Sequence, residues 1–562
     1  MCVACPGAGK TFTMSQRAGH LVSVHAEGNL AAVSFTAAAA GELRERILRT
    51  VSCSPKRIGA GTFHSLAKHQ LTQAGIKVKL ASEMQTRQAI ENLAATAGVD
   101  ANDLISAIDL FKSDPYPSEP AAEYRAAIRD YQSWLDREGL MDFSDLLRRA
   151  VAGMADGSVA PMNVRWMLAD EIQDADAMQW AWLFAHAKAG VELTCVGDED
   201  QSIYRWRNAL GYAGMREFID RYGAKLMQLD VSYRCDRQII ETADRLIRKN
   251  AAHRTAKQLR SASNDKGSVN VRRFGTLKLE ADGIANELGG LDVEALKDWA
   301  VLARSNADFY IIEAALQKAN IPYYRANATS FWDTMDAKRF LMLMSDLGSG
   351  EFSALASLLQ AAGITESVVD RVRERCRAGA GSPLERFSFI NLPSALASDV
   401  LRDLQVNLRA WIEHIRGKKY AALAIGVSDW LIRTKIGSNR WAKQPDRFVT
   451  PFANLKGSIA QRLRRIQELI KEQNSGQGVT LCTLHASKGL EWRSVWLFGV
   501  HEGRLPHENG NEIEERCLAY VGMTRAKSNL IIGTLPAISN GTGPSSFLAE
   551  AELLYPVSGQ AA

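Results

Sequence analysis

The sequence predicts an α/β protein with two blocks of parallel sheet, each interrupted by a mostly helical segment. Strand-like apolar runs alternate with helical stretches in two separated regions, residues 1–75 with 161–228 and residues 229–345 with 475–562. Such alternation is typical of parallel sheets, because each strand returns to the sheet through a helix. The intervening segments, 76–160 and 346–474, carry Ala and Leu at helical spacing with charges between them.

The length and composition indicate a multidomain globular protein. A chain of 562 residues is too long for one core, so roughly three or four folding units are expected. Its 46% hydrophobic and 23% charged residues are ordinary for such proteins. No apolar run approaches the roughly 20 residues that cross a bilayer, and the N-terminus lacks the pattern of a signal peptide. We therefore expect no membrane association and a cytoplasmic location.

Net charge and cysteine content exclude few functional classes. The 68 basic and 63 acidic residues leave a formal charge of +5, which permits polyanion binding without requiring it. Cys2 and Cys5 form the only CxxC pair among eight scattered cysteines, and a glycine-rich turn follows them instead of a second pair. Reduced cysteines are thus favoured over a zinc or redox site.

Polar residues follow several predicted strands of the first block. The runs at 30–36 (LAAVSFT), 166–169 (WMLA) and 193–197 (LTCVG) each lead into polar residues. Open parallel sheets bind ligands at the carboxyl ends of their strands. In the second helical segment, basic residues concentrate at 371–377, 416–419 and 462–471. Either a solvated helix face or contacts with a phosphate backbone would explain them.

The strongest local motif is a phosphate-binding loop near the N-terminus. Residues 4–11 read ACPGAGKT, in which Gly7 and Gly9 let backbone N–H groups curve around phosphate oxygens at the start of a helix. Lys10 would reach the β and γ phosphates, and Thr11 would hold Mg²⁺. The general pattern wants Gly where Ala4 stands. The predicted nucleotide-contacting stretch is Ala4, Cys5, Pro6, Gly7, Ala8, Gly9, Lys10, Thr11 and Phe12.

A second motif supplies carboxylates at a strand end. The apolar run WMLA leads directly into Asp170 and Glu171. A carboxylate beside a phosphate-binding loop can position the metal, and its neighbour can take a proton from the attacking water. Asp170 is therefore predicted to hold Mg²⁺ together with Thr11, and Glu171 to act as general base.

Phosphoryl transfer also needs positive charge near the departing γ-phosphate. Arg234, in LDVSYRC, and Arg525, in AYVGMTRAK, are the candidates from the second block. An arginine supplied across a cleft would couple hydrolysis to domain closure.

Together, these motifs and five further strings resemble the superfamily 1A helicases of the UvrD/Rep/PcrA type. The strings are GTFHSLA at 61–67, VGDEDQSIYRWRNA at 196–209, VLARSNA at 301–307, TLHASKGLEW at 483–492 and EERCLAYVGMTRAK at 514–527. The resemblance implies two RecA-like domains with ATP between them, each interrupted by a helical insertion. It assigns 1–75 and 161–228 to domain 1A, 76–160 to insertion 1B, 229–345 and 475–562 to domain 2A, and 346–474 to insertion 2B.

The resemblance also assigns roles at the nucleotide. Gln173 and Gln201 would lie near the γ-phosphate and link hydrolysis to the strand-binding surface. Tyr233 would stack on adenine, Arg17 would lie beside the base, and Glu491 would accept from the ribose hydroxyls. Arg234 and Arg525 occupy the arginine-finger positions of the family.

A motor that steps along any sequence needs stacking platforms and backbone contacts rather than base-edge readout. The residues in the DNA-contacting motifs of the family are Phe35, Thr36, Phe63, His64, Tyr204, Trp206, Arg207, His485 and Phe547. Trp206, flanked by Arg205 and Arg207, is the foremost candidate for stacking on a base.

The resemblance implies an ATP-dependent, Mg²⁺-requiring DNA helicase that moves 3′ to 5′ on single-stranded DNA and opens duplexes at single-strand/duplex junctions. A monomer or weak dimer is expected, with accessory replication or repair proteins as possible partners. One alternative is a translocase that displaces proteins without unwinding. Another is an ATP-dependent DNA-binding regulator with little hydrolysis. Because Met1 stands three residues before the loop, without the glutamine segment that reads adenine in the family, weak selectivity for adenine is also expected.

Overall fold

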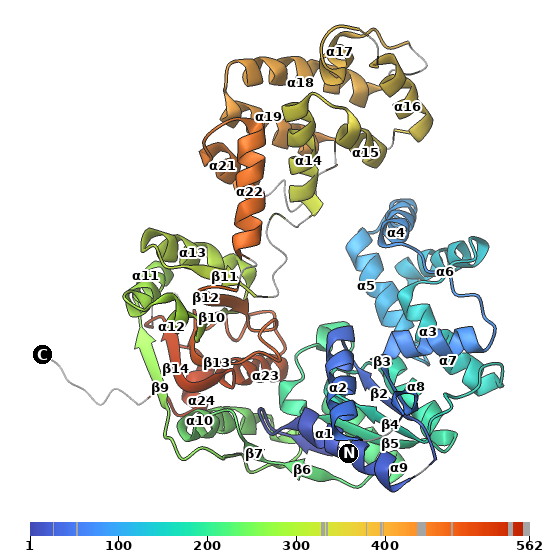
Figure 1. Cartoon of the computed structure of the whole chain (residues 1–562), viewed down its shortest axis with the longest axis vertical. Coiled ribbons are helices and arrows are strands. Elements are labelled where there is room, and N and C mark those ends of the chain that lie inside the picture. Colours follow the sequence, from blue (N-terminus) through green and yellow to red (C-terminus); the bar gives the residue numbers. More distant parts are fainter. Residues whose placement is uncertain are drawn as a thin grey trace, which may run out of the picture. The chain divides into compact units, whose positions relative to one another are not determined.

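The computed structural model describes residues 1–25, 27–51, 54–326, 332, 335–362, 364–377, 379–393, 396, 398–434, 436, 446–473, 476–537 and 543–554. The chain divides into two compact units (Figure 1). The first comprises Met1–Leu291, Asp298–Ile321 and Thr483–Ala562, and the second comprises Asp292–Lys297 and Pro322–Cys482. Among the described residues, no helix is both long and apolar enough to cross a membrane.

The first sheet of unit 1 has six strands in the order β3-β2-β4-β5-β1-β6. The strands are β1 (Cys2–Ala4), β2 (Leu30–Ser34), β3 (Ile58–Thr62), β4 (Trp166–Ala169), β5 (Glu192–Gly197) and β6 (Met227–Leu229). Although β1 has only three residues, it pairs in parallel with β5 and β6. It therefore lies inside the sheet and aims the loop that follows at the sheet's carboxyl edge.

Both faces of this sheet are buried, as expected of parallel strands covered by helices. Leu30 and Ala32 of β2 pack in one hydrophobic cluster, and Ala31 and Val33 pack in the other. The associated helices are α1 (Lys10–Val24), α2 (Ala37–Thr50), α3 (Phe63–Gln73), α8 (Ala177–Lys188) and α9 (Tyr212–Tyr222). This double burial explains why the strands read as continuous apolar runs.

Three of the helices between β3 and β4 build a separate core within unit 1. They are α4 (Glu83–Ala97), α5 (Ala101–Lys112) and α6 (Ala122–Arg137), which share a hydrophobic cluster. The next helix, α7 (Phe143–Asp156), instead packs in the core of the first sheet. At the end of α5, the buried Lys112 ammonium lies 2.6 Å from Asp142 and 2.9 Å from Asp145. This contact ties α5 to the start of α7.

A second parallel sheet lies in the C-terminal part of unit 1. Its strands there are β10 (Trp299–Ala303), β13 (Trp492–Leu497), β14 (Ala526–Thr534) and β9 (Ser268–Arg273), paired in that order. The helices are α10 (Arg237–Ile247), α11 (Leu277–Leu288), α13 (Phe309–Lys318), α23 (Glu512–Met523) and α24 (Ser546–Glu550), and β7 (Val231–Ser232) pairs with β8 (Arg260–Ser261). The predicted α/β class with two parallel sheets is confirmed, while the domain boundaries stay predictions.

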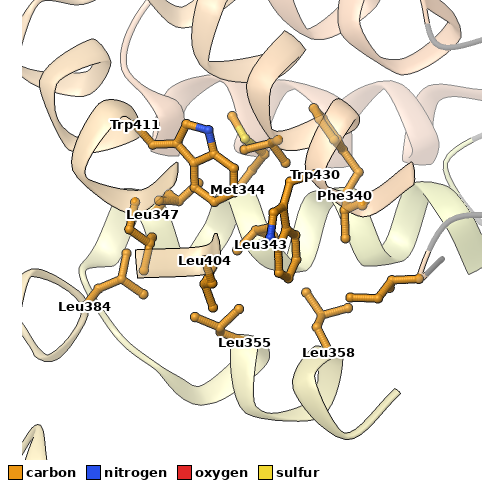
Figure 2. Packing of buried hydrophobic residues seen from close by; sticks show 14 of the residues in the cluster. Phe340, Leu343, Met344, Leu347, Leu355, Leu358, Leu384, Leu404, Trp411 and Trp430 are labelled. Carbon is orange, nitrogen blue, oxygen red and sulfur yellow. The ribbon is translucent and has the colours of Figure 1, made fainter. Parts of the chain in front are cut away.

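Unit 2 is mostly helical. It contains α12 (Val293–Lys297), α14 (Met335–Ser349), α15 (Ser353–Ala361), α16 (Glu366–Arg375), α17 (Pro383–Phe389), α18 (Asp399–Arg416), α19 (Tyr420–Arg433), α21 (Asp446–Asn454) and α22 (Ile459–Gln473), with the parallel pair β11 (Tyr323–Arg325) and β12 (Val479–Thr483). Figure 2 shows its core, where the Trp411 and Trp430 rings meet edge to face with centroids 6.1 Å apart. Of the basic residues noted above, Arg462 is buried and donates to the carbonyls of Phe452, Ala453 and Gly457, so its role is structural.

Candidate nucleotide and strand-binding site

The loop between β1 and α1 has the backbone of a phosphate cradle. Gly7 and Gly9 both adopt left-handed φ angles, of 71° and 78°, which disfavour side chains. A Cβ on Gly7 would lie 2.4 Å from Cβ of Arg234, and the Tyr233 amide donates to the Gly7 carbonyl at 2.9 Å. Gly9 begins α1 without a side-chain cap, so the first amides of α1 suit an anion.

Lys10 is ion-paired in this structure. Its Nζ lies 2.9 Å from Oε2 of Glu171, and the same oxygen accepts from Gln173 Nε2 at 2.7 Å. Burial would raise the pKa of Glu171, but Lys10, Lys488 and the Gln173 amide together lower it to about 2. Glu171 is therefore ionised at neutral pH. Burial and the neighbouring Glu171 charge raise the pKa of Asp170 to about 6.

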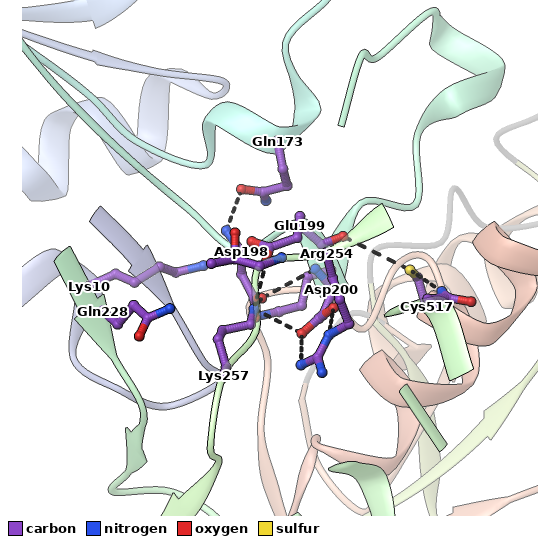
Figure 3. Close-up of polar contacts among 12 residues, drawn as sticks. Lys10, Gln173, Asp198, Glu199, Asp200, Gln228, Arg254, Lys257 and Cys517 are labelled. Atoms are coloured by element: carbon purple, nitrogen blue, oxygen red, sulfur yellow. Dashed lines mark hydrogen bonds and ion pairs between the residues drawn. The ribbon is translucent and has the colours of Figure 1, made fainter. Parts of the chain in front are cut away.

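A path of hydrogen bonds continues from Gln173 towards the C-terminal sheet, and Figure 3 shows its first bond, between Gln173 and Asp198. Gln173 Oε1 accepts from the Asp198 amide at 2.9 Å, and Asp198 Oδ2 accepts from Gln201 Nε2 at 2.5 Å. Gln201 Oε1 in turn accepts from Arg525 Nη2 at 3.1 Å. Two 3₁₀ turns hold these residues, η2 (Ile172–Asp174) and η3 (Glu199–Gln201). The predicted base, both glutamines and one predicted arginine thus share one network.

The two candidate arginines differ in their surroundings. Arg525 is only 1% exposed and also donates to the carbonyls of Val521 and Leu490. Burial and the Arg234 charge lower the pKa of Arg525 to about 9. Arg234 donates to Glu491 at 2.6 Å, and the same carboxylate pairs with Lys527 at 2.8 Å. Arg234 thus lies against the phosphate loop at Gly7, whereas Arg525 is linked to the site through Gln201.

The residues predicted to lie near the base differ in accessibility. Tyr233 is 76% exposed, and Phe12 is also exposed. Arg17, however, donates to Thr194 and to Glu192, both at 2.8 Å. Arg17 must therefore leave an exposed ion pair to approach a base, and its predicted role stays a prediction, as does that of Glu491.

The turn after Gln201 presents the ring of Trp206 to solvent beside the half-buried Tyr204. Trp206, in the turn η4 (Arg205–Arg207), is 62% exposed, and the guanidinium of Arg207 lies 4.5 Å from its ring centroid. Tyr204 meets Trp206 edge to face. Lys488 lies 5.2 Å from the Tyr204 ring centroid and also contacts Asp174 Oδ2 at 2.5 Å and the Gln201 carbonyl at 2.9 Å. Lys488 thus links the turn that carries Tyr204 and Trp206 to the Asp174 carboxylate and to Gln201.

The three phenylalanines predicted to contact the strand are less accessible. Phe63 and Phe547 are each 1% exposed and pack in the interior, so neither offers a free ring face in this structure. Phe35 lies against Phe63, whereas Thr36 is exposed and caps α2 by accepting from the Ala39 amide. These four assignments stay predictions.

The two histidines assigned to strand contact are half-buried. His64 stacks on the exposed Phe143, with ring centroids 4.2 Å apart. Burial lowers the pKa of His64 to about 4, and burial together with Arg304 lowers that of His485 to about 4. Both rings are therefore neutral at pH 7 and would donate hydrogen bonds, not positive charge, to a strand.

Several residues of the site were not anticipated from the sequence. Lys257 lies fully buried between Asp198 and Asp200, beside Arg254 (Figure 3). Lys488 lies in TLHASKGLEW, so its motif could have indicated it. No local pattern singles out Lys257 or Arg254.

Asp170 and Thr11 are the predicted ligands of Mg²⁺. Among the described residues, no group of three or more His, Cys, Asp or Glu side chains could hold a metal ion. Mg²⁺ usually takes only one or two protein carboxylates beside substrate phosphates, so Asp170 with the partly exposed Thr11 fits that role, which stays a prediction.

Cys2 and Cys5 are buried free thiols. Burial raises the pKa values of both, that of Cys5 to about 12. Neither is a thiolate at neutral pH.

Comparisons with known proteins identify related chains. The model of the UvrD/REP helicase N-terminal domain matches residues 1–216, and that of the UvrD-like helicase C-terminal domain matches residues 227–379 and 450–535. The chain is 28% identical to DNA helicase II of Escherichia coli (strain K12), covering 94% of this chain and 81% of the relative. It is 25% identical to ATP-dependent DNA helicase PcrA of Bacillus subtilis (strain 168), with 98% and 83% covered. It is 27% identical to ATP-dependent DNA helicase Rep of Escherichia coli (strain K12), with 94% and 87% covered.

Proposed function

This chain belongs to the UvrD/REP helicase family, and from that premise we propose that it hydrolyses ATP to move 3′ to 5′ along single-stranded DNA and to unwind duplexes at single-strand/duplex junctions. The observation that carries the proposal is the hydrogen-bonded path from Lys10 to Arg525, which includes Gln201. Three residues beyond Gln201 the exposed aromatic turn begins. The segment 201–207 thus carries both Gln201, which contacts the proposed catalytic groups, and the aromatic side chains proposed to stack on the DNA strand.

Hydrolysis requires Lys10 to change partners. The amides at the start of α1 would bind the phosphates, and Lys10 would leave Glu171 to pair with them. Departure of this cation raises the basicity of Glu171, because Lys10 is the largest contribution that lowers its pKa. Glu171 then accepts a proton from the attacking water. Mg²⁺, held by Thr11 and Asp170, would supply charge neutralisation at the phosphates.

Two arginines complete the positive charge around the γ-phosphate. Arg525 is already held by the Val521 and Leu490 carbonyls and by Gln201, so its position is set before nucleotide binds. Arg234 would exchange Glu491 for a phosphate oxygen, which leaves Oε2 of that carboxylate for the ribose hydroxyls while Oε1 keeps its contact with Lys527. Tyr233 offers an exposed ring for stacking on the base.

Movement along the strand follows from the same contacts. Lys488 bridges Asp174, the Gln201 carbonyl and the Tyr204 ring. A shift of Gln201 on hydrolysis is therefore transmitted to the turn that carries Tyr204 and Trp206. Bases that stack on this turn would be released and recaptured one step further along, without readout of their edges.

The direct test is the ATPase rate with and without single-stranded DNA, followed by strand displacement on substrates with a 3′ or a 5′ tail. We expect strong stimulation by DNA and unwinding only from the 3′ tail. Stimulated hydrolysis with displacement of a streptavidin block but no strand separation would favour the protein-displacing translocase. ATP-dependent DNA binding with no hydrolysis would favour the regulator.

A further inference from the structure

A buried cluster of charges joins the segment after α10 to the acidic turn after β5 (Figure 3). The Lys257 ammonium lies 2.8 Å from Oδ1 of Asp198, 2.8 Å from Oδ2 of Asp200 and 3.4 Å from Oε1 of Glu199. Arg254 adds two hydrogen bonds to Asp200, at 2.9 and 2.7 Å. Two cations from the C-terminal block thus hold three consecutive carboxylates that follow a strand of the N-terminal sheet.

The cluster is also held through its backbone. The Thr255 amide donates to Glu199 Oε1 at 2.7 Å, and the Ala256 carbonyl accepts from Gln228 at 2.8 Å. These bonds set the position of the chain on both sides of Ala256. Lys257 is therefore presented to the carboxylates by a fixed backbone, which makes the geometry of its ammonium well defined.

Stability alone does not account for such a cluster. Taking several charges out of water costs about as much as their attraction returns, so buried ion pairs add little net stability. Burial would lower the pKa of Lys257, but the three carboxylates outweigh this and raise it well above its usual value, so the ammonium stays charged. A fixed charge at this place constrains the orientation of the side chains around it.

Asp198 connects this cluster to the catalytic network. Its Oδ1 contacts Lys257, its Oδ2 accepts from Gln201, and its amide donates to Gln173. Oδ1 also accepts from the Asp200 amide at 3.3 Å, but the contact with the Lys257 ammonium is shorter and carries the opposite charge. Without the ammonium, the carboxylate would lose its strongest partner, and Gln201 would face a less firmly oriented acceptor. The next contact along the path is the one between Gln201 and Arg525.

We propose that Lys257 is a positioning residue for ATP hydrolysis, which orients Asp198 and through it the Gln201–Arg525 pair. The inference rests on the proposed function, because the roles of Gln201 and Arg525 belong to it. Lys257 does not touch the nucleotide in this scheme. Its loss should therefore lower kcat and leave ATP affinity nearly unchanged.

The test compares Lys257→Met with a matched control, Lys112→Met, in the full chain. Lys112 is also buried and also pairs with two carboxylates, Asp142 and Asp145, but it lies outside the catalytic network. Both variants should lower the melting temperature. We expect Lys257→Met to lower kcat about 10- to 100-fold, since small misplacements far from the chemistry reach that size. Binding of a fluorescent ATP analogue should stay near the wild-type value, and Lys112→Met should keep basal kcat per folded molecule.

Lys257→Arg serves as the second variant, because it keeps the charge while changing the donor geometry. It should fold, and its kcat should lie between those of the wild type and Lys257→Met. If Lys257→Met does not fold, Lys257→Arg with wild-type kcat would overturn the inference. So would a folded Lys257→Met with wild-type kcat, or equal kcat losses in Lys257→Met and Lys112→Met. A wild-type chain without DNA-stimulated hydrolysis would instead refute the proposed function.

Discussion

Arg525 donates a hydrogen bond from Nη2 to Oε1 of Gln201 at 3.1 Å, although 324 positions separate the two residues. Both side chains are buried, so the contact is made in a low-dielectric environment, where a guanidinium near a phosphate acts most strongly. The pair joins the C-terminal sheet region to the turn that follows β5. Mutations at either end should therefore affect hydrolysis, in addition to the stability that the buried hydrogen bonds provide.

The first prediction concerns Arg525. Replacement by Ala should lower DNA-stimulated ATP turnover about a thousandfold or more, the usual contribution of an arginine finger. Arg525→Lys should recover little, because an ammonium cannot reproduce three fixed directions of donation. Steady-state ATPase at saturating single-stranded DNA measures both variants. Turnover close to the wild-type rate in Arg525→Ala would show that another cation serves the γ-phosphate.

The second prediction distinguishes the role of Glu171 as general base from the role of Lys10 as phosphate ligand. Glu171→Gln should lower turnover roughly 10²- to 10⁴-fold, because it keeps the shape but removes the proton acceptor. ATP affinity should stay equal or increase, since the amide releases Lys10 from the ion pair seen at 2.9 Å.

Lys10→Ala is the companion variant, and it should weaken nucleotide binding by removing a fixed charge from the phosphates. Titration with a fluorescent ATP analogue distinguishes the two. Equal weakening of binding in Glu171→Gln and Lys10→Ala would contradict the base assignment.

The third prediction concerns the aromatic turn. Because Trp206 is 62% exposed, Trp206→Ala should leave the melting temperature unchanged. Affinity for single-stranded DNA should fall by roughly 5- to 150-fold, which corresponds to the loss of one stacked base. Trp206→Phe keeps a ring face and should recover much of the loss. A matching fall in basal and DNA-stimulated ATPase would mean that the side chain supports the fold or the nucleotide site.

The fourth prediction concerns a buried carboxyl group away from the nucleotide. Glu280 of α11 accepts from Trp496 Nε1 and from the Gly499 amide, each at 3.1 Å, and burial raises its pKa to about 7. The unfolded chain releases this proton near the ordinary value, so the folded state holds more protons between about pH 4.5 and 7. The free energy of unfolding should therefore decrease as pH rises through this window, by roughly 2 kcal/mol between pH 5 and 7.

Glu280→Gln isolates this effect, because the amide oxygen can accept the same hydrogen bonds without titrating. Denaturant unfolding at pH 5 and pH 7 should show that the wild type loses stability relative to the variant as pH rises. A constant difference between the two proteins across this range would mean that Glu280 titrates normally in the folded state.

Much of the fold and the nucleotide site could be predicted from local patterns. The apolar runs of β2 and β4 indicated buried strands, and both strands are buried on both faces. The loop ACPGAGKT required two glycines in unusual backbone conformations, and Gly7 and Gly9 adopt them. These features depend on residues adjacent in the chain, so their physical cause can be read from the sequence.

Accessibility was less predictable. Phe63 and Trp206 both stand in motifs that resemble those of strand-contacting families, yet the Phe63 ring packs against Trp182 and the Trp206 ring faces solvent. Motif membership does not distinguish these cases. Which aromatic ring is covered depends on helices and strands that pack over it from elsewhere in the chain.

By itself, the sequence determined the α/β class, the family and the chemistry of the phosphate loop, because backbone conformation and burial periodicity are set over a few neighbouring residues. Only the tertiary structure decided which charges meet. Lys257 reaches Asp198 across 59 positions, and Lys10 reaches Glu171 across 161. Lys10 and Glu171 meet because both follow strands of one parallel sheet, whereas Lys257 comes from the second α/β block. In both places, the cost of burying a charge selects a partner of opposite sign. Neither the spacing nor the type of these residues specifies that partner in advance.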